Sequence, residues 1–225
     1  MKQQAQPALV QRLFLRLFST SQDVDGLWVG SLEDKPYPGL QRVDQALRLI
    51  KQHAPLHYSR ILHNLQRILV NLVSGAAAEY QHSLNACVLD KRFVLLETTA
   101  LEEIASAIVH EATHARLEHW GIEYDEKERA RIEAICMRRE LDLLSRLPNS
   151  ESLQAEMAHK LEWYAGNQEW FSDENQKQHH REGSVATLRY LRVPEWLIGV
   201  LLKVVALRSA VRRLARFTGR SSQPG

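Results

Sequence analysis

Apolar side chains recur every three to four positions along most of the chain, which is the pattern of helices that bury one face. Several of these segments are bounded by residues that begin or end helices, such as Pro55 and Gly121. The helices that the pattern predicts cover residues 9–18, 40–53, 56–65, 99–120, 123–147 and 153–164, and a further helix begins at Pro194.

Between the third and fourth of these helices the pattern changes to short extended runs, which predict a small sheet. Polar or Gly- and Pro-rich segments predict loops, with Trp28 between the first two of them as a core anchor. The predicted extended runs are 76–80, 86–89 and 93–96, and the pattern leaves 68–73 open as a further strand or a continuation of the helix before it. The predicted loops are 23–26, 35–39 and 166–183. Together these elements predict an α+β fold that is mainly α-helical, with a small sheet and C-terminal helices.

The predicted helix 99–120 has clear signals at both of its ends. Thr99 and Glu102 have the spacing of a capping box, which would set the helix start. Gly121 is a natural residue just beyond a helix end.

Within this helix, His110, Glu111 and His114 form the pattern H-E-x-x-H. Positions i and i+4 share a helix face, so both imidazoles can bind one metal ion. Glu111 lies about 100° round the helix from His110, where it can hold a water on that metal without being a ligand. Two His ligands, a carboxylate base and an open coordination position predict a zinc hydrolase.

The residues that flank this motif are apolar or small, which argues against an exposed helix with two solvated histidines. They are Ile104, Ala105, Ala107, Ile108, Val109, Ala112, Ala115 and Leu117. A helix of this composition is buried and closely packed, and buried charged groups need a partner. A metal ion is the natural partner for this group.

The next predicted helix, 123–147, carries two carboxylates on its apolar face. With Ile132 as the centre of that face, Glu133 and Glu140 both fall inside it, and Cys136 is most simply a small core residue. A carboxylate on a buried face is costly unless it is paired or coordinated. One of the two is therefore a candidate third ligand.

The spacing of His110, Glu111 and His114 followed by Glu133 resembles that of the gluzincin group of zinc metallopeptidases, over residues 60–147. The resemblance implies a zincin-like fold, Zn²⁺ held by the two histidines and Glu133, Glu111 as general base, and peptide hydrolysis. It also implies a sheet edge that pairs with an extended substrate near the metal.

The chain departs from the gluzincin pattern in two ways. Many gluzincins have an acidic residue four positions after the third ligand, where this chain has Met137, and no motif identifies a Tyr or His that stabilises the transition state. Glu140 lies two turns beyond Glu133, roughly 10 Å along the helix axis, so both carboxylates cannot reach one zinc. We expect Glu140 to support the ligands by hydrogen bonding, or to pair with Arg129 or Arg116.

The substrate edge implied by this resemblance is 86–89. The metzincin pattern does not fit, because it requires Gly and His where this chain has Leu117 and Trp120.

The chain divides into three predicted parts. Residues 1–54 form an N-terminal helical segment packed on the core, 55–147 form the metal-binding core, and 148–225 form a C-terminal helical extension with a basic tail. The end of this extension, 194–220, is apolar first and Arg-rich later, so it could cover the core, bind a protein partner or lie on a membrane surface.

Composition narrows the remaining classes of function. A formal net charge of +2 gives no reason to expect nucleic-acid binding. Two cysteines, Cys87 and Cys136, do not make a disulfide framework, and we expect a cytoplasmic protein, with peripheral membrane association as an option.

The sequence therefore predicts a zinc-dependent hydrolase that acts on peptides or proteins. Two alternatives stay open: a zincin-like binding module whose metal is structural, and a membrane-associated interaction protein. The presence of Glu111 distinguishes the hydrolase from the binding module, since a purely structural metal site has no use for a base at this position.

Overall fold

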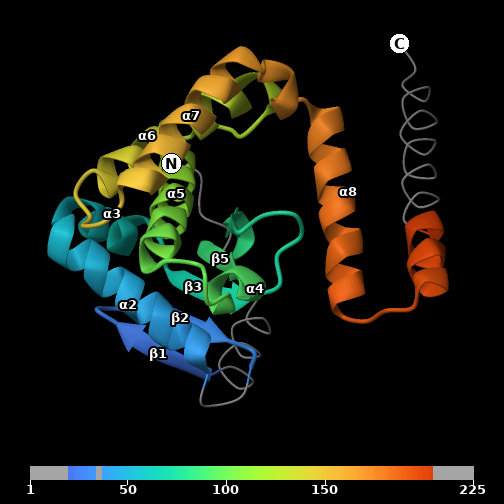
Figure 1. Cartoon of the computed structure of the whole chain (residues 1–225), viewed down its shortest axis with the longest axis horizontal. Helices are drawn as coiled ribbons and strands as arrows, with labels where there is room; N and C mark the ends of the chain where they lie inside the picture. The colour runs from blue at the N-terminus through green and yellow to red at the C-terminus, as the bar shows by residue number, and fades with distance from the viewer. Residues whose placement is uncertain (1–19, 34–36, 205–225) are drawn as a thin grey trace, which may run out of the picture.

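The computed structural model describes residues 20–33 and 37–204, which form a mainly helical α+β fold with one small sheet (Figure 1). The predicted fold class is confirmed. The predicted helix 9–18 and the Arg-rich end of the chain lie outside the described residues. The helices are α2 (Pro38–His53), α3 (Pro55–Asn64), α4 (Lys91–Leu95), α5 (Leu101–His119), α6 (Glu126–Leu144), α7 (Glu151–Gly166) and α8 (Asp173–Tyr190), with short 3-10 helices η1 (His82–Leu84) and η2 (Gln168–Phe171).

The sheet has five strands in the order β1-β2-β3-β5-β4. Its strands are β1 (Thr20–Val24), β2 (Leu27–Ser31), β3 (Arg67–Asn71), β4 (Ala78–Gln81) and β5 (Ala86–Asp90). Strands β2, β3 and β5 are parallel, and antiparallel β1 and β4 form the two edges. The expectation that 86–89 is the substrate-pairing edge is therefore wrong, because β5 lies between β3 and β4 and is buried along its length.

The first two strands form a hairpin that was not predicted, since only the loop at 23–26, which includes its turn, was expected from the sequence. Asp25 and Gly26 make its two-residue turn with positive φ at both positions, and the Gly26 N–H donates to Asp23 Oδ1 at 2.9 Å. An Asp-Gly pair is the usual signal for this turn. Trp28, expected in the core, is only partly buried, and it packs against a smaller apolar cluster that includes Leu69.

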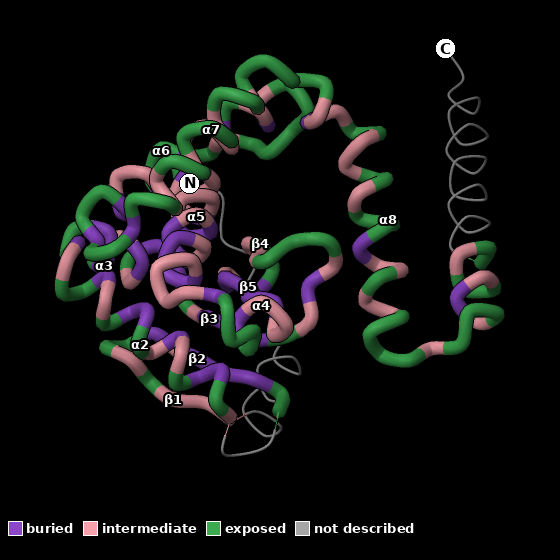
Figure 2. Tube along the Cα trace, in the orientation of Figure 1, coloured by how far each residue is buried: buried purple, intermediate pink, exposed green. Residues whose placement is uncertain are grey.

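The main core lies where α2, α3 and α5 pack on one face of the sheet (Figure 2). Strand residues such as Ile68 and Leu89 face helix residues such as Val43, Ile61 and Ile108, all fully buried. The alternation along each strand sends every second side chain to this face, which is why the sheet can support α5 as a buried central helix.

Three further local predictions need correction. Residues 93–96 are not a strand, because Asp90 caps a short helix there: its Oδ1 accepts from the Arg92 N–H at 2.7 Å. The capping box predicted from Thr99 and Glu102 does not form, because the N-cap of α5 is Ala100, which has no side-chain acceptor; Glu103 alone caps this end, accepting from the Ala100 N–H at 2.6 Å. The segment 166–183 is helical, in η2 and most of α8.

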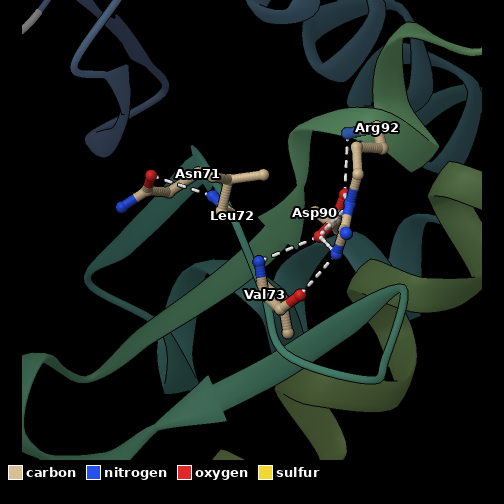
Figure 3. A network of polar contacts seen from close by, with 5 residues as sticks. All are labelled: Asn71, Leu72, Val73, Asp90 and Arg92. Carbon is tan, nitrogen blue, oxygen red and sulfur yellow. Dashed lines mark hydrogen bonds and ion pairs between the residues drawn. The ribbon is translucent and has the colours of Figure 1, made fainter. Parts of the chain in front are cut away.

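A network around Asp90 fixes the segment that leaves β3 (Figure 3). Its carboxylate accepts from the Val73 N–H at 2.9 Å and from Arg92, whose guanidinium also donates to the Val73 carbonyl at 2.7 Å. Burial by itself would raise the pKa of Asp90, but Arg92 and the Val73 N–H hold it below its usual value. The segment that follows, which leads into β4, is thus anchored at its base.

The same segment meets α8 further along. A Cβ built on Gly183 would lie 2.3 Å from the backbone of Gly75, so the two backbones approach as only two glycines allow. This contact fixes α8 beside the β4 end of the sheet.

The helix that follows α8 is exposed at Trp196, and no helix of the described part is long and apolar enough to cross a membrane.

Candidate metal centre and its cleft

Helix α5 presents both motif histidines to one point. The Nε2 atoms of His110 and His114 lie 3.1 Å apart, and each side chain is mostly buried. The i, i+4 spacing accounts for this convergence. Small buried residues on the same helix, Ala105, Ala112 and Ala115, let its neighbours approach closely.

Helix α6 brings Glu133 to the same point. Its carboxylate oxygens lie 3.2 Å from His110 Nε2 and 3.4 Å from His114 Nε2. The edges of a tetrahedron around zinc, with bonds of about 2.0–2.1 Å, are about 3.3 Å long. The Glu133 carboxylate as a group, with Oε2 near His110 and Oε1 near His114, therefore lies within the spacing that a zinc site needs, and the residues present fit that metal.

Glu140, one of the two carboxylates on the apolar face of α6, orients His110. Its Oε1 accepts from His110 Nδ1 at 2.6 Å, and its Oε2 accepts from Ser106 Oγ at 2.6 Å. With the Nδ1 proton directed at a carboxylate, His110 Nε2 keeps its lone pair for a metal. Pairing with Arg129, the alternative considered from the sequence, does not occur, because Arg129 bonds the Phe171 carbonyl and Asp173.

Arg116, the other candidate partner of Glu140, stacks on the ring of Trp120, with its guanidinium carbon 4.3 Å from the ring centroid.

Glu111 is the unusual member of the group. Glu111 is only 6% exposed, yet no hydrogen bond or ion pair joins its side chain to any residue of the described part. Burial raises its pKa, and the charges of His110 and His114 act in the opposite direction. Its carboxylate lines the cleft, and a carboxylate that is mostly buried there without a protein donor calls for a functional reason.

The charges around the two imidazoles favour a cation at this point. Burial by itself would lower the pKa of His110, but Glu140 and Glu133 raise it well above its usual value. For His114, the thiol of Cys136 and Glu133 outweigh burial and raise the pKa to about 10. Conversely, these histidines hold the pKa of buried Glu133 far below its usual value. Protons or a metal ion can supply this positive charge.

Cys136, which was expected to be a small core residue, is a further candidate donor to the metal. Its side chain is fully buried, but Sγ and one ligand nitrogen from each of His110 and His114 lie within 4.8 Å of one another. Cys136 follows Glu133 by three positions, so both side chains project from one face of α6. The three-residue spacing from Glu133 was therefore the signal in the sequence that could have identified Cys136 as a candidate donor.

Tyr124 was not identified as a site residue from the sequence. It lies in the turn after Gly121, and its Oη donates to Glu133 Oε1 at 2.5 Å. Its ring meets the ring of His114 edge-on, with centroids 5.3 Å apart. Tyr124 is half-exposed, so a hydroxyl group stands at the open side of the centre.

The centre opens into a cleft of about 1750 Å³. One wall is the edge strand β4 with the segment before it, and the opposite wall comes from α7, η2 and α8, which contribute Tyr164, Trp170, Phe171 and His179. The turn between α5 and α6 forms a third side. The segment 166–183, predicted to be a solvated loop, thus supplies much of one wall.

The structure brings together all four residues selected from the sequence, His110, Glu111, His114 and Glu133, at the floor of this cleft. Comparison of the chain with protein-family models, curated proteins and solved structures returned no match, so the chemistry of the site is argued from its own geometry.

Proposed function

We propose that this chain is a zinc-dependent hydrolase, and more specifically a peptidase of the gluzincin type. The observation that carries the proposal is Glu111, a buried carboxylate beside two converging imidazoles with no protein donor among the described residues. A structural metal site gains nothing from such a group, whereas a hydrolase needs a base there.

His110, His114 and Glu133 would hold the zinc ion. When bound, zinc acts as a Lewis acid and lowers the pKa of a water ligand. Glu111 accepts the proton of the attacking water and passes it to the amine that leaves when the C–N bond breaks. Its raised pKa, caused by burial, suits a group that must take up and release a proton.

Tyr124 is the group best placed to stabilise the oxyanion that forms on the attacked carbonyl. Its hydroxyl already lies at the donor cluster, on the side that opens to the cleft. A donor aimed at developing negative charge is worth most in a partly dry site.

Strand β4 supports peptides as the substrate class. It pairs only with β5 among the described strands, so its outer backbone edge can pair with an extended chain. Ala78, Glu79 and Tyr80 of this strand line the same cleft as the metal donors. The role expected for 86–89 thus passes to β4.

The first prediction concerns metal content. Protein purified without chelators should contain about one zinc per chain, because two imidazole nitrogens and a carboxylate already converge on one point. Elemental analysis by mass spectrometry tests this, and His110→Ala and His114→Ala should each lose the metal. Absence of zinc, nickel, cobalt and iron from the wild type would remove the basis of the proposal.

The second prediction concerns Tyr124. Tyr124→Phe should keep the metal and lower kcat by about 100-fold, because one donor to the transition state is lost. The exposed Tyr190, outside the cleft, provides a matched control in Tyr190→Phe. An unchanged kcat in Tyr124→Phe would assign oxyanion stabilisation to another group.

A further inference from the structure

The charge of the cleft differs from that of the chain as a whole. The chain has 29 lysines and arginines, yet none of the described residues that line the cleft is a lysine or an arginine. Glutamates and histidines supply all of its ionisable side chains apart from the tyrosines. Beyond the metal centre, the carboxylates are Glu79 on β4, Glu118 at the end of α5 and Glu123 in the following turn.

These carboxylates are not all neutralised by neighbours. Glu118 is paired with His82, whose Nδ1 lies 2.5 Å from Oε1. Glu79 is exposed on the edge strand and forms no ion pair with any residue of the described part. Nearby guanidinium groups are held elsewhere, with Arg116 on Trp120 and Arg129 on Asp173.

The wall opposite β4 is aromatic. Trp170 is the centre of a cluster, with ring centroids 6.4 Å from Tyr164 in a stacked arrangement and 4.1 Å from His179. The ring of Trp163, which does not line the cleft, meets the ring of Trp170 edge-on, with centroids 5.5 Å apart. Indole and phenol faces attract cationic side chains, and Trp does so most strongly.

This wall is a fixed part of the fold. The close backbone approach of Gly75 and Gly183 joins α8 to the segment before β4, and the Asp90 network anchors that segment at its base. Glu79 on β4 and the aromatic rings of Tyr164 and Trp170 therefore line the same cleft from elements that are joined to each other.

We propose that the cleft selects peptides that carry a lysine or arginine side chain close to the bond to be cleaved. The carboxylate of Glu79, which forms no ion pair with any described residue, attracts the positive charge, and the Trp170 ring receives the alkyl stem and cationic head. The neighbouring Tyr164 ring already has a cation over it, Lys160 Nζ, at 5.9 Å from its centroid. The proposal rests on the proposed peptidase function for the site of cleavage, but peptide recognition can be measured without cleavage.

Binding is tested with the full chain carrying Glu111→Gln and loaded with zinc. The probes are fluorescently labelled peptides of alanine and glycine that differ only at one central position, which is Lys, Leu or Glu. Fluorescence anisotropy should give about tenfold tighter binding of the Lys peptide than of the Leu peptide at low ionic strength, and weaker binding still of the Glu peptide. The Lys preference should shrink at 1 M salt, where screening extends to about 3 Å.

Two additional changes localise the effect. Glu79→Gln and Trp170→Leu should each reduce the Lys preference by roughly fivefold, the size expected from one contact of about 1 kcal/mol. The matched controls are Glu156→Gln on the exposed face of α7 and Trp196→Leu beyond α8, both outside the cleft. These controls should leave the preference unchanged.

Equal binding of the Lys and Leu peptides would overturn the inference, and so would a Lys preference that survives both cleft substitutions. Failure of the proposed function has a different signature. Zinc-loaded wild type would bind the Lys peptide with the same preference, lost in Glu79→Gln, yet leave every peptide intact. That result would support selective recognition and refute hydrolysis.

Discussion

Substitution of Glu111 by Gln should abolish hydrolysis while the metal stays bound. The amide is the same size as the carboxylate but cannot take a proton from water, and loss of a general base typically costs about 10²–10⁴-fold in rate. His110, His114 and Glu133 do not depend on Glu111 for their positions, because no hydrogen bond among the described residues joins it to them. Metal analysis and peptide cleavage, measured on the same sample, test both halves.

The same substitution should also change stability in a defined direction. In the metal-free protein, burial raises the folded-state pKa of Glu111, so the ionised group destabilises the fold at pH values above its unfolded pKa. Gln removes that cost, and the Tm of the metal-free variant near neutral pH should exceed that of the metal-free wild type. A gain of stability with a loss of activity is typical of a group kept for catalysis.

Glu102→Gln provides the control, since it makes the same chemical change on the same helix without touching the donors. It should leave the metal, the rate and Tm close to the wild-type values. If Glu111→Gln emptied the site, Glu111 would be a ligand instead of a base, and the assignment of roles would be wrong.

The parts of the site that follow from local geometry could be predicted from sequence. His110 and His114 share a face because any helix puts i and i+4 together, and the burial of Glu133 and Glu140 follows from the period of α6. That the structure separates the two carboxylates, with Glu140 on His110 Nδ1, also follows from their separation along one axis.

The parts of the site and of the fold that depend on packing between elements could not be predicted from the sequence. Helical periodicity assigned Cys136 to an apolar face, but it could not say that this face meets His114. Tyr124 lies in a turn whose direction depends on how α5 and α6 pack. The order of strands in the sheet is likewise tertiary, which is why β5 was mistaken for an edge and β4 was not identified as one.

The helix α8 was missed for a different reason. Its sequence is mostly polar, and Gly183 is its one buried residue, so no apolar stripe marks it. Local signals do define its start, where Ser172 Oγ accepts from the Asn175 N–H at 3.3 Å. Its position comes from the contact of Gly183 with Gly75, far away in the sequence.

Loss of Glu133 should have the largest effect on the metal among the acidic residues. Glu133→Ala removes a donor that lies 3.2 and 3.4 Å from the two imidazole nitrogens, so zinc affinity should fall far more than in Glu140→Ala. Glu140 only orients His110, and loss of such a partner typically costs about 10–100-fold in affinity. Competition titration with a zinc-sensitive dye measures both variants on one scale.

Cys136 is the rival third donor, and the same titration decides between the two. With Glu133 as ligand, Cys136→Ser should bind zinc nearly as well as the wild type, because the thiol then interacts with His114 without binding the metal, and a serine hydroxyl can do the same. With Cys136 as ligand, the serine variant would lose affinity as strongly as Glu133→Ala, and the cobalt-loaded wild type would show thiolate-to-metal absorption that the serine variant lacks. We expect no such absorption, because the two Glu133 carboxylate oxygens already lie 3.2 and 3.4 Å from the imidazole nitrogens of His110 and His114.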